Sequence, residues 1–339
     1  MPARLAITLL TLALPLALAL PARAQPDQVD MDAAKKEGTV SWYTSTPIET
    51  AQRLARKFTE QTGIKVQLFR SGGEAVLRRF FQELDAKKIV ADVLTVSDPT
   101  ATEELIRRGA LVAFKPKNFD KVPDEFKNKD GYAVAQRLNL LGIVVRTDLV
   151  PEADRPKNWP DLTDPKYKGK MVMPDPSFTA NQLMVVGMLS RKYGWEFYQK
   201  LKANDIMIVQ GHQQVSDTLK RGERIIAAEG SDAYAYDDRK DGHKVEMVFP
   251  SEGAFGVPAP TMIIKGSPSP NAAKALADFM ISDTAQTMLA EDGSYAARSD
   301  IKPPAGSRPL KDIKFIPIDY AHIEKEKQNI KNRFNEIYQ

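Results

Sequence analysis

The stretch from Thr39 to Val96 decides the fold, and it has the sequence TVSWYTSTPIETAQRLARKFTEQTGIKVQLFRSGGEAVLRRFFQELDAKKIVADVLTV. Thr39 to Tyr43 is a short run of strand formers, and apolar residues at helical spacing follow it as far as Gly63. Ile64 to Leu68 alternates as a second strand before a second amphipathic segment, and Val90 to Val96 is a third strand. Strands that alternate with helices predict a mostly parallel sheet covered on both faces.

Polar turns follow each of these three strands. They are Thr46-Pro47-Ile48-Glu49, Ser71-Gly72-Gly73-Glu74 and Ser97-Asp98-Pro99-Thr100, and each has the hydroxyl, carboxylate or proline that is typical of a helix start. Carboxyl ends of parallel strands meet at one edge of a sheet, where open α/β sheets bind their ligands. The sequence therefore predicts ligand contacts from this edge, namely Thr44, Ser45, Ser71, Gly72 and Ser97.

The middle of the chain repeats the pattern. Met171 to Met173, Ile206 to Val209 and Arg224 to Ala228 are expected strands, and a polar turn and a helical segment follow each of them. This predicts a second α/β lobe with its own polar edge. The candidate contacts on that edge are Ser177, His212, Ser231, Tyr234 and Tyr236.

Two long extended segments lie between the predicted lobes. Val134 to Arg146 and Gly256 to Lys265 are expected to cross from one lobe to the other, with a hinge behind a cleft. The resulting division is lobe 1 from residues 25–137 and 257–302, lobe 2 from residues 138–256, and an extension from residues 303–339 that packs on the outside of a lobe. The fold class is α/β, with two lobes and hinge strands. Arg137, near the first crossing strand, is a candidate bidentate partner for an anion.

The first 24 residues predict export. Arg4 gives a cationic start, Leu5 to Leu20 is apolar and uncharged, and Ala22-Arg23-Ala24 is typical of a cleavage site before Gln25. The apolar run contains Pro15 and is short for a bilayer span of about 20 residues. We therefore expect a cleaved signal peptide and a periplasmic mature chain.

Composition argues against several functional classes. The formal net charge of +4 falls to +2 when Arg4 and Arg23 leave with the signal, and the remaining charges are interleaved, which is not typical of a nucleic-acid binder. With no cysteine, the chain has no disulfide and no zinc site of the cysteine type. Common catalytic motifs and phosphate-binding loops are missing from the sequence, and the three histidines are widely separated. We expect a binding protein with no cofactor, although a carboxylate-based hydrolase stays open.

The order of several short motifs resembles the family 1 extracellular solute-binding proteins, in the branch named for ferric-ion binding. The motifs are Ser41-Trp42-Tyr43-Thr44-Ser45, Thr62-Gly63-Ile64-Lys65-Val66, Ala91-Asp92-Val93, Asn158-Trp159-Pro160-Asp161-Leu162, Tyr167-Lys168-Gly169-Lys170 and Gly253-Ala254-Phe255-Gly256. The resemblance covers nearly the whole mature chain. It implies a type II periplasmic binding fold and a monomer that closes on a small-molecule solute. It also implies delivery of that solute to an inner-membrane ABC permease with its ATPase, and a receptor that presents its solute to a sensor kinase is the alternative.

The sequence departs from the family at the iron donors. Where iron-binding members place a first-turn donor, an acidic donor and paired tyrosines, this chain has Pro47, Ser97 and Asp232-Ala233. Tyr234 and Tyr236 are nearby, but two residues apart on a helix they would point about 200° from each other. Both could face one ion only if the segment is extended. Ferric iron, a hard cation that prefers oxygen donors, therefore stays the alternative cargo.

The anion-holding part of the family's site is better preserved. The resemblance places Ser177 in the loop that cradles an anion, His212 at a polar anion contact and Ser231 close to a second one. Helix amino ends on both lobes carry partial positive charge that suits phosphate or carboxylate groups. The prediction is therefore a small anionic or zwitterionic organic solute, which means a phosphonate, a phosphate ester or a carboxylate.

Overall fold

The computed structural model describes residues 27–339, and the predicted signal peptide lies outside them. The helices are α1 (Met31–Glu37), α2 (Ile48–Thr62), α3 (Gly73–Asp85), α4 (Pro99–Arg107), α5 (Ala180–Tyr193), α6 (Glu196–Ala203), α7 (His212–Arg221), α8 (Asp232–Lys240), α9 (Pro270–Met280), α10 (Asp283–Glu291) and α11 (Tyr320–Tyr338). The strands are β1 (Thr39–Thr44), β2 (Lys65–Arg70), β3 (Val93–Thr95), β4 (Leu111–Val112), β5 (Val134–Arg146), β6 (Met171–Pro174), β7 (Met207–Val209), β8 (Ile226–Ser231), β9 (Val245–Val248), β10 (Phe255–Ile264) and β11 (Tyr295–Ala296).

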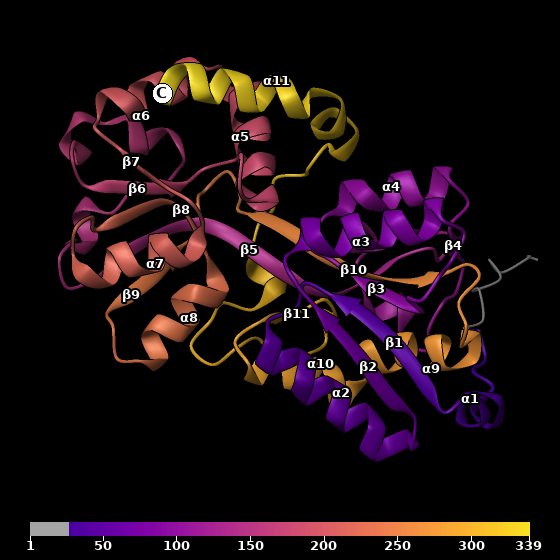
Figure 1. The fold of residues 1–339 in the computed structure, drawn as a ribbon. Coiled ribbons are helices and arrows are strands. Elements are labelled where there is room, and N and C mark those ends of the chain that lie inside the picture. Colours follow the sequence, from indigo (N-terminus) through magenta and orange to yellow (C-terminus); the bar gives the residue numbers. More distant parts are fainter. Residues whose placement is uncertain (1–26) are drawn as a thin grey trace, which may run out of the picture.

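One continuous sheet joins two lobes, and its strand order is β2-β1-β3-β10-β5-β8-β6-β7, with β4, β9 and β11 on side branches. Lobe 1 holds the parallel set β2, β1 and β3, and lobe 2 holds the parallel set β8, β6 and β7. The sheet as a whole is mixed, because β5 and β10 run antiparallel to their neighbours. The α/β fold predicted from the alternation of strands and helices is confirmed (Figure 1).

The long strands β5 and β10 connect the lobes, as predicted from their length and apolar composition. They pair with each other from Phe255 opposite Leu141 to Thr261 opposite Val134, and the register shifts between Ala259 and Pro260. Proline has no backbone N–H to donate to a sheet, so Pro260 fits a place where the pairing is irregular. Figure 1 shows both strands passing through the centre of the molecule.

Each lobe has its own apolar core. In lobe 1, Trp42, Leu54 and Phe58 are fully buried between the sheet and its helices. In lobe 2, the indole of Trp159 packs on Phe255 and donates its Nε1–H to the carbonyl of Gly253 at 2.9 Å. This bond fixes the start of β10 against lobe 2, because a buried indole N–H requires an acceptor.

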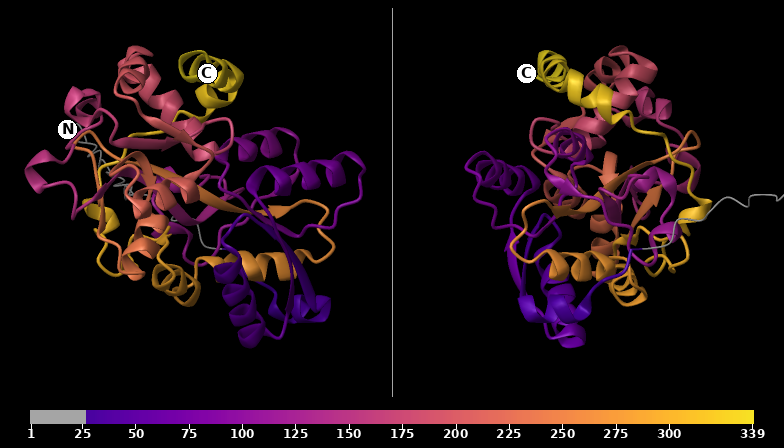
Figure 2. Two further views of the ribbon diagram at one scale, coloured as in Figure 1. Left: turned by 60° about the vertical axis from the view of Figure 1, so that its left-hand side comes forward. Right: turned by 90° about the vertical axis from the view of Figure 1, so that its right-hand side faces the viewer.

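The C-terminal helix α11 packs along α5 of lobe 2 and also touches α4 of lobe 1 (Figures 1 and 2). Gly187 on α5 makes the close approach possible, since a Cβ there would lie 2.3 Å from Cδ1 of Ile323. No helix in residues 27–339 has the length and apolar character of a membrane span.

Two local predictions need correction. The hydroxyls of Thr46 and Ser71 do not cap the helices that follow, because the N-cap residues are Pro47 and Gly72 and neither helix start has a side-chain cap. Asp98 does cap α4, accepting from the N–H of Thr100. Strand β8 also continues through Glu229 and Gly230 to Ser231, a stretch that the sequence assigns to a turn.

Candidate functional site

The three turns at the carboxyl ends of β1, β2 and β3 come together, as predicted. The N–H of Ser71 donates to the carbonyl of Thr44 at 3.2 Å, and the N–H of Ser97 donates to Oγ of Ser45 at 3.2 Å. Thr44 is buried, and its hydroxyl donates to Oγ1 of Thr46 at 2.9 Å. The polar edge of lobe 1 is therefore held in place by hydrogen bonds between the turns. Ser71 is partly exposed on this edge and Gly72 is exposed.

Arg70 is a cation at this edge that the sequence analysis missed. It is the last residue of β2, exposed, and its Nε donates to the carbonyl of Thr46 at 3.1 Å. It takes part in none of the ion pairs formed by the described side chains. Its position was available from the sequence, because it directly precedes Ser71-Gly72 at the end of a predicted strand.

Arg137 supplies a second and more buried cation from the hinge strand β5. Its side chain is 5% exposed, its Nη2 donates to Oγ of Ser97 at 3.2 Å, and its Nη1 donates to Oδ1 of Asn139. Its Nε has no partner within the described structure. Burial lowers the pKa of Arg137 to about 10, so the guanidinium remains charged at neutral pH.

Lobe 2 contributes a buried charged pair. Nε2 of His212, at the start of α7, lies 2.9 Å from a carboxylate oxygen of Glu229 on β8. The ring of Tyr234 stacks over the imidazole with centroids 6.3 Å apart. Burial alone lowers the pKa of His212, but the Glu229 carboxylate outweighs it and the pKa is raised. Because Nε2 already faces Glu229, only Nδ1 is left for a ligand.

Asp232, the first residue of α8, is the second residue that the candidate set omitted. It is 6% exposed, and its Oδ1 accepts from the N–H of Leu140 on β5 at 2.9 Å. Its Oδ2 has no hydrogen-bond partner among the described atoms. Desolvation raises the pKa of this carboxyl to about 7. Asp232, Arg70 and Tyr234 all influence the pKa of Arg137, so both lobes contribute to its electrostatic surroundings.

The remaining candidates have different surroundings. Ser231 is 8% exposed at the end of β8, and the N–H of Ser177 donates to Oδ1 of Asp175 at 2.7 Å in the turn before α5. Tyr236 lies against Gly293, where a Cβ would be 2.2 Å from its ring, and its hydroxyl donates to the carbonyl of Glu291 at 3.4 Å. Residues 232–240 are helical, so Tyr234 and Tyr236 point in different directions.

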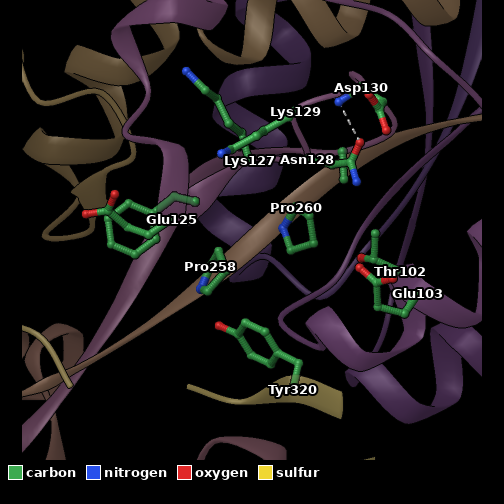
Figure 3. Close-up of a pocket in the computed structure, with 12 residues that line it drawn as sticks. Thr102, Glu103, Glu125, Lys127, Asn128, Lys129, Asp130, Pro258, Pro260 and Tyr320 are labelled. Carbon is green, nitrogen blue, oxygen red and sulfur yellow. Dashed lines mark hydrogen bonds between the residues drawn. The ribbon is translucent and has the colours of Figure 1, made fainter. Parts of the chain in front are cut away.

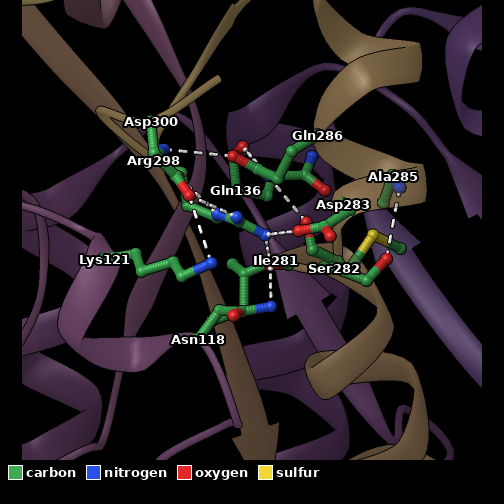
Figure 4. Close-up of polar contacts among 11 residues, drawn as sticks. Asn118, Lys121, Gln136, Ile281, Ser282, Asp283, Ala285, Gln286, Arg298 and Asp300 are labelled. Carbon is green, nitrogen blue, oxygen red and sulfur yellow. Dashed lines mark hydrogen bonds and ion pairs between the residues drawn. The ribbon is translucent and has the colours of Figure 1, made fainter.

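We refer to Arg70, Ser97, Arg137, Asp232 and Tyr234, with the turns around them, as the interlobe site. Its floor is tied to lobe 1 through Gln136 on β5, whose Nε2 donates to Oγ1 of Thr46 at 2.7 Å. Behind it, the carbonyl of Gln136 accepts from Gln286, and the buried Arg298 joins Asp283 and Asp300 (Figure 4). This network anchors the hinge strand to α10.

A cavity of about 410 Å³ lies elsewhere, along β10. Pro258 and Pro260 form its floor, α4 and the loop around Lys127 to Asp130 form its walls, and Tyr320 of α11 closes one side (Figure 3). None of the candidate ligand residues lines it. Within the described residues, no group of three or more His, Asp or Glu side chains is placed to hold a metal ion.

Comparison with known sequences agrees with this architecture. Residues 88–326 match the family model described as bacterial extracellular solute-binding protein. A Salmonella typhimurium periplasmic protein, whose proposed ligand is 2-aminoethylphosphonate, is 26% identical over 282 residues, which is 79% of this chain and 77% of the relative.

Solved structures show the same fold. Iron-bound HitA from Pseudomonas aeruginosa superposes with a TM-score of 0.76 at 18% identity, covering 88% of this chain and 99% of that one. AfuA from Actinobacillus pleuropneumoniae, solved with fructose-6-phosphate, superposes with a TM-score of 0.73 at 22% identity, covering 88% and 98%. The resemblance inferred from the sequence motifs is confirmed, and the chain belongs to the bacterial extracellular solute-binding proteins.

Proposed function

We propose that this protein is the periplasmic binding component of an ABC importer and that it carries a small organic solute with a phosphonate, phosphate-ester or carboxylate group. The observation that carries the proposal is Arg137, a guanidinium buried at the junction of the lobes with no ion-pair partner among the described carboxylates. A buried cation with no carboxylate in ion-pair contact is costly, and an anionic ligand would supply that contact.

The surroundings of Arg137 suit an anion. Arg70 adds a second guanidinium at the end of β2, and the hydroxyl of Ser97 and the amino end of α3 at Gly72 add further donors. Guanidinium groups bind phosphate and carboxylate through paired N–H groups, and helix amino ends favour negative charge. These groups come from separate turns of lobe 1 and from the hinge.

Lobe 2 adds acceptors, which extends the proposal to zwitterions. Asp232 has a buried carboxylate oxygen without a hydrogen-bond partner in the described chain, Tyr234 has a phenol, and both influence the pKa of Arg137. An ammonium group on the solute would pair with Asp232 while its acidic group meets the arginines. The relative associated with 2-aminoethylphosphonate and the fructose-6-phosphate complex of AfuA support a ligand with this chemistry.

We further propose that the lobes close on the solute about β5 and β10, with lobe 1 as residues 25–137 and 257–302 and lobe 2 as residues 138–256. Export through the N-terminal signal, action as a monomer and delivery to a membrane permease belong to the same proposal. A sensor kinase as the receiving partner is the alternative. Release of the mature chain by osmotic shock of the host cells would test the location.

The ligand is tested by calorimetric titration of the mature chain with 2-aminoethylphosphonate, sugar phosphates and simple carboxylates. Arg137→Gln should weaken binding of the preferred compound by about 10- to 100-fold, since a hydrogen-bonded charge pair contributes about 1.5–3 kcal/mol. Arg107→Gln is the matched control, because Arg107 is exposed at the end of α4, and it should leave affinity unchanged.

Ferric iron is the competing cargo, because the Asp232 carboxylate and the Tyr234 phenol on α8 are hard oxygen donors. Titration with ferric citrate separates the two proposals. Tight binding with a visible tyrosinate-to-iron absorption band, lost in Tyr234→Phe, together with no heat from any organic anion, would replace our proposal with the iron one.

A further inference from the structure

A second polar cavity, of about 140 Å³, lies beside α8, β9 and the segment 306–308. Arg239, Arg308, Ser307, Tyr295 and Asp232 line it, and Phe249 forms an apolar wall. Only Asp232 is shared with the interlobe site. The other lining residues belong to the last turn of α8, to β9 and the residue after it, to β11 and to residues 306–308, so this cavity is built from different parts of the chain.

Two arginines in this cavity have no carboxylate partner in the ion pairs of the described chain. Nη2 of Arg239 donates to Oγ of Ser307 at 3.3 Å, and the guanidinium of Arg308 lies 4.8 Å from the centroid of the Phe249 ring. Glu246 also lines the cavity, but its carboxylate is held by Arg155 at 2.9 Å. The cavity therefore holds two cations whose N–H groups are only partly used.

The positions of these groups are fixed by the backbone. The hydroxyl of Tyr295 donates to the carbonyl of Arg308 at 2.7 Å, and Tyr295 itself lies on β11, which pairs with β5 opposite Leu138. The segment that carries Ser307 and Arg308 is thereby attached to the hinge strand. Arginine guanidiniums favour tetrahedral or planar oxyanions, which accept N–H groups from two sides.

Asp232 also lines the cavity. It is 6% exposed, and its Oδ2, which is itself buried, has no hydrogen-bond partner among the described atoms. A carboxylate would repel an anion, but desolvation raises the pKa of Asp232 to about 7. At neutral pH a proton therefore partly neutralises this group, and Asp232 opposes an anion in the cavity less than an ordinary carboxylate would.

We propose that this cavity is a second binding site, for a small oxyanion of the size and charge of inorganic phosphate, separate from the interlobe site. The two guanidiniums and the Ser307 hydroxyl contact the anion. The site adjoins the hinge, because Asp232 also accepts from the N–H of Leu140 on β5. Its occupant therefore stabilises the region about which the lobes are proposed to close.

Calorimetric titration of the mature chain with inorganic phosphate, at constant ionic strength set by chloride, tests the site through its stoichiometry. We expect Arg137→Gln, which weakens the interlobe site, to retain one phosphate-binding event. Adding Arg239→Gln and Arg308→Gln to that variant should remove it, and adding Arg107→Gln should leave it. In the Arg137→Gln protein, saturating phosphate should raise the Tm by about 3 °C.

The outcomes separate this inference from the proposed function. One phosphate per chain that Arg137→Gln abolishes would support the interlobe anion site and overturn the second site. One phosphate that persists in Arg137→Gln, and is lost when Arg239→Gln and Arg308→Gln are added to that protein, would support the second site alone. Phosphate binding that survives when Arg239→Gln and Arg308→Gln are added to the Arg137→Gln protein would also overturn the inference. So would the absence of phosphate binding in the Arg137→Gln protein itself. If the double variant unfolds, Arg308→Gln alone, at an exposed side chain, should still weaken phosphate at least 5-fold.

Discussion

On lobe 1, hydroxyls and amides of three turns hold the edge together beside the cations Arg70 and Arg137, whereas on lobe 2 the polar groups are buried acids and an imidazole. Ser45, Ser71 and Ser97 join their turns through neutral hydrogen bonds, and Arg70 beside them is exposed. On lobe 2, His212, Glu229 and Asp232 are each less than a tenth exposed. The difference teaches that neutral hydrogen bonds between turns organise one edge, and that buried charges whose removal disturbs the fold organise the other.

The largest expected effect of a substitution is at His212. His212→Ala should lower the free energy of unfolding by about 3–5 kcal/mol, because Glu229, at 2% exposed, would become a buried charge without its partner. Urea denaturation of the mature chain measures this loss. His322→Ala is the control, and its free energy of unfolding should stay within about 0.5 kcal/mol of that of the unsubstituted chain. Restoring neutrality with His212→Gln and Glu229→Gln together should recover part of the loss.

Asp232 should make the stability of lobe 2 depend on pH. Its folded-state pKa is raised from 3.8 to about 7, so the folded protein holds this proton more tightly than the unfolded chain does. The resulting stability is complete below about pH 4 and is lost as the pH rises through 7. His212, whose pKa is also raised, acts in the same direction near neutrality.

Asp232→Asn isolates the carboxyl in that dependence. Its amide oxygen still accepts from Leu140, so the fall in unfolding free energy between pH 5 and pH 8 should shrink by about 2 kcal/mol relative to the unsubstituted chain. Chemical denaturation at the two pH values measures the difference. An unchanged fall would show that Asp232 titrates normally and that lobe 2 is not organised by this charge.

A smaller effect comes from the same chemical change made on each lobe. Gly230 lies on β8, and a Cβ there would come within 2.5 Å of Cγ2 of Val144, so Gly230→Ala should cost about 1–3 kcal/mol of stability. Gly72, at the start of α3, has nothing within 4 Å of an added Cβ, so Gly72→Ala should cost less than about 1 kcal/mol. Thermal unfolding of the two variants compares them directly, and equal losses would contradict the difference between the lobes.

Much of the fold followed from the sequence. The strand and helix order of lobe 1 was predicted from apolar spacing, and both hinge strands were predicted close to their observed bounds, because spacing and length are local properties of the chain. The helix caps were predicted less well than the strands and helices. Thr46 was expected to cap α2, but its hydroxyl bonds to Thr44 and Gln136, and the second of these lies 90 residues away in the chain.

The candidate site shows the same limit. Arg137 was selected from its position near a crossing strand, but Arg70 and Asp232 were not, although each stands beside a residue that was selected. They matter because of their surroundings. Within residues 27–339, Arg70 is a cation without an ion-pair partner that influences Arg137, and Asp232 has a carboxylate oxygen without a hydrogen-bond partner. Those properties depend on distances between lobes and cannot be inferred from neighbours in sequence.

By itself the sequence determined the α/β class, the two repeated units and the turns that end the strands, because hydrophobic spacing and turn residues act over a few positions. Tertiary structure alone decided which polar groups are free. Burial removes water from Arg137, Glu229 and Asp232, and only the packing of segments far apart in the chain supplies or withholds their partners. Whether a charge is a structural pair or a ligand contact therefore depends on the assembled fold.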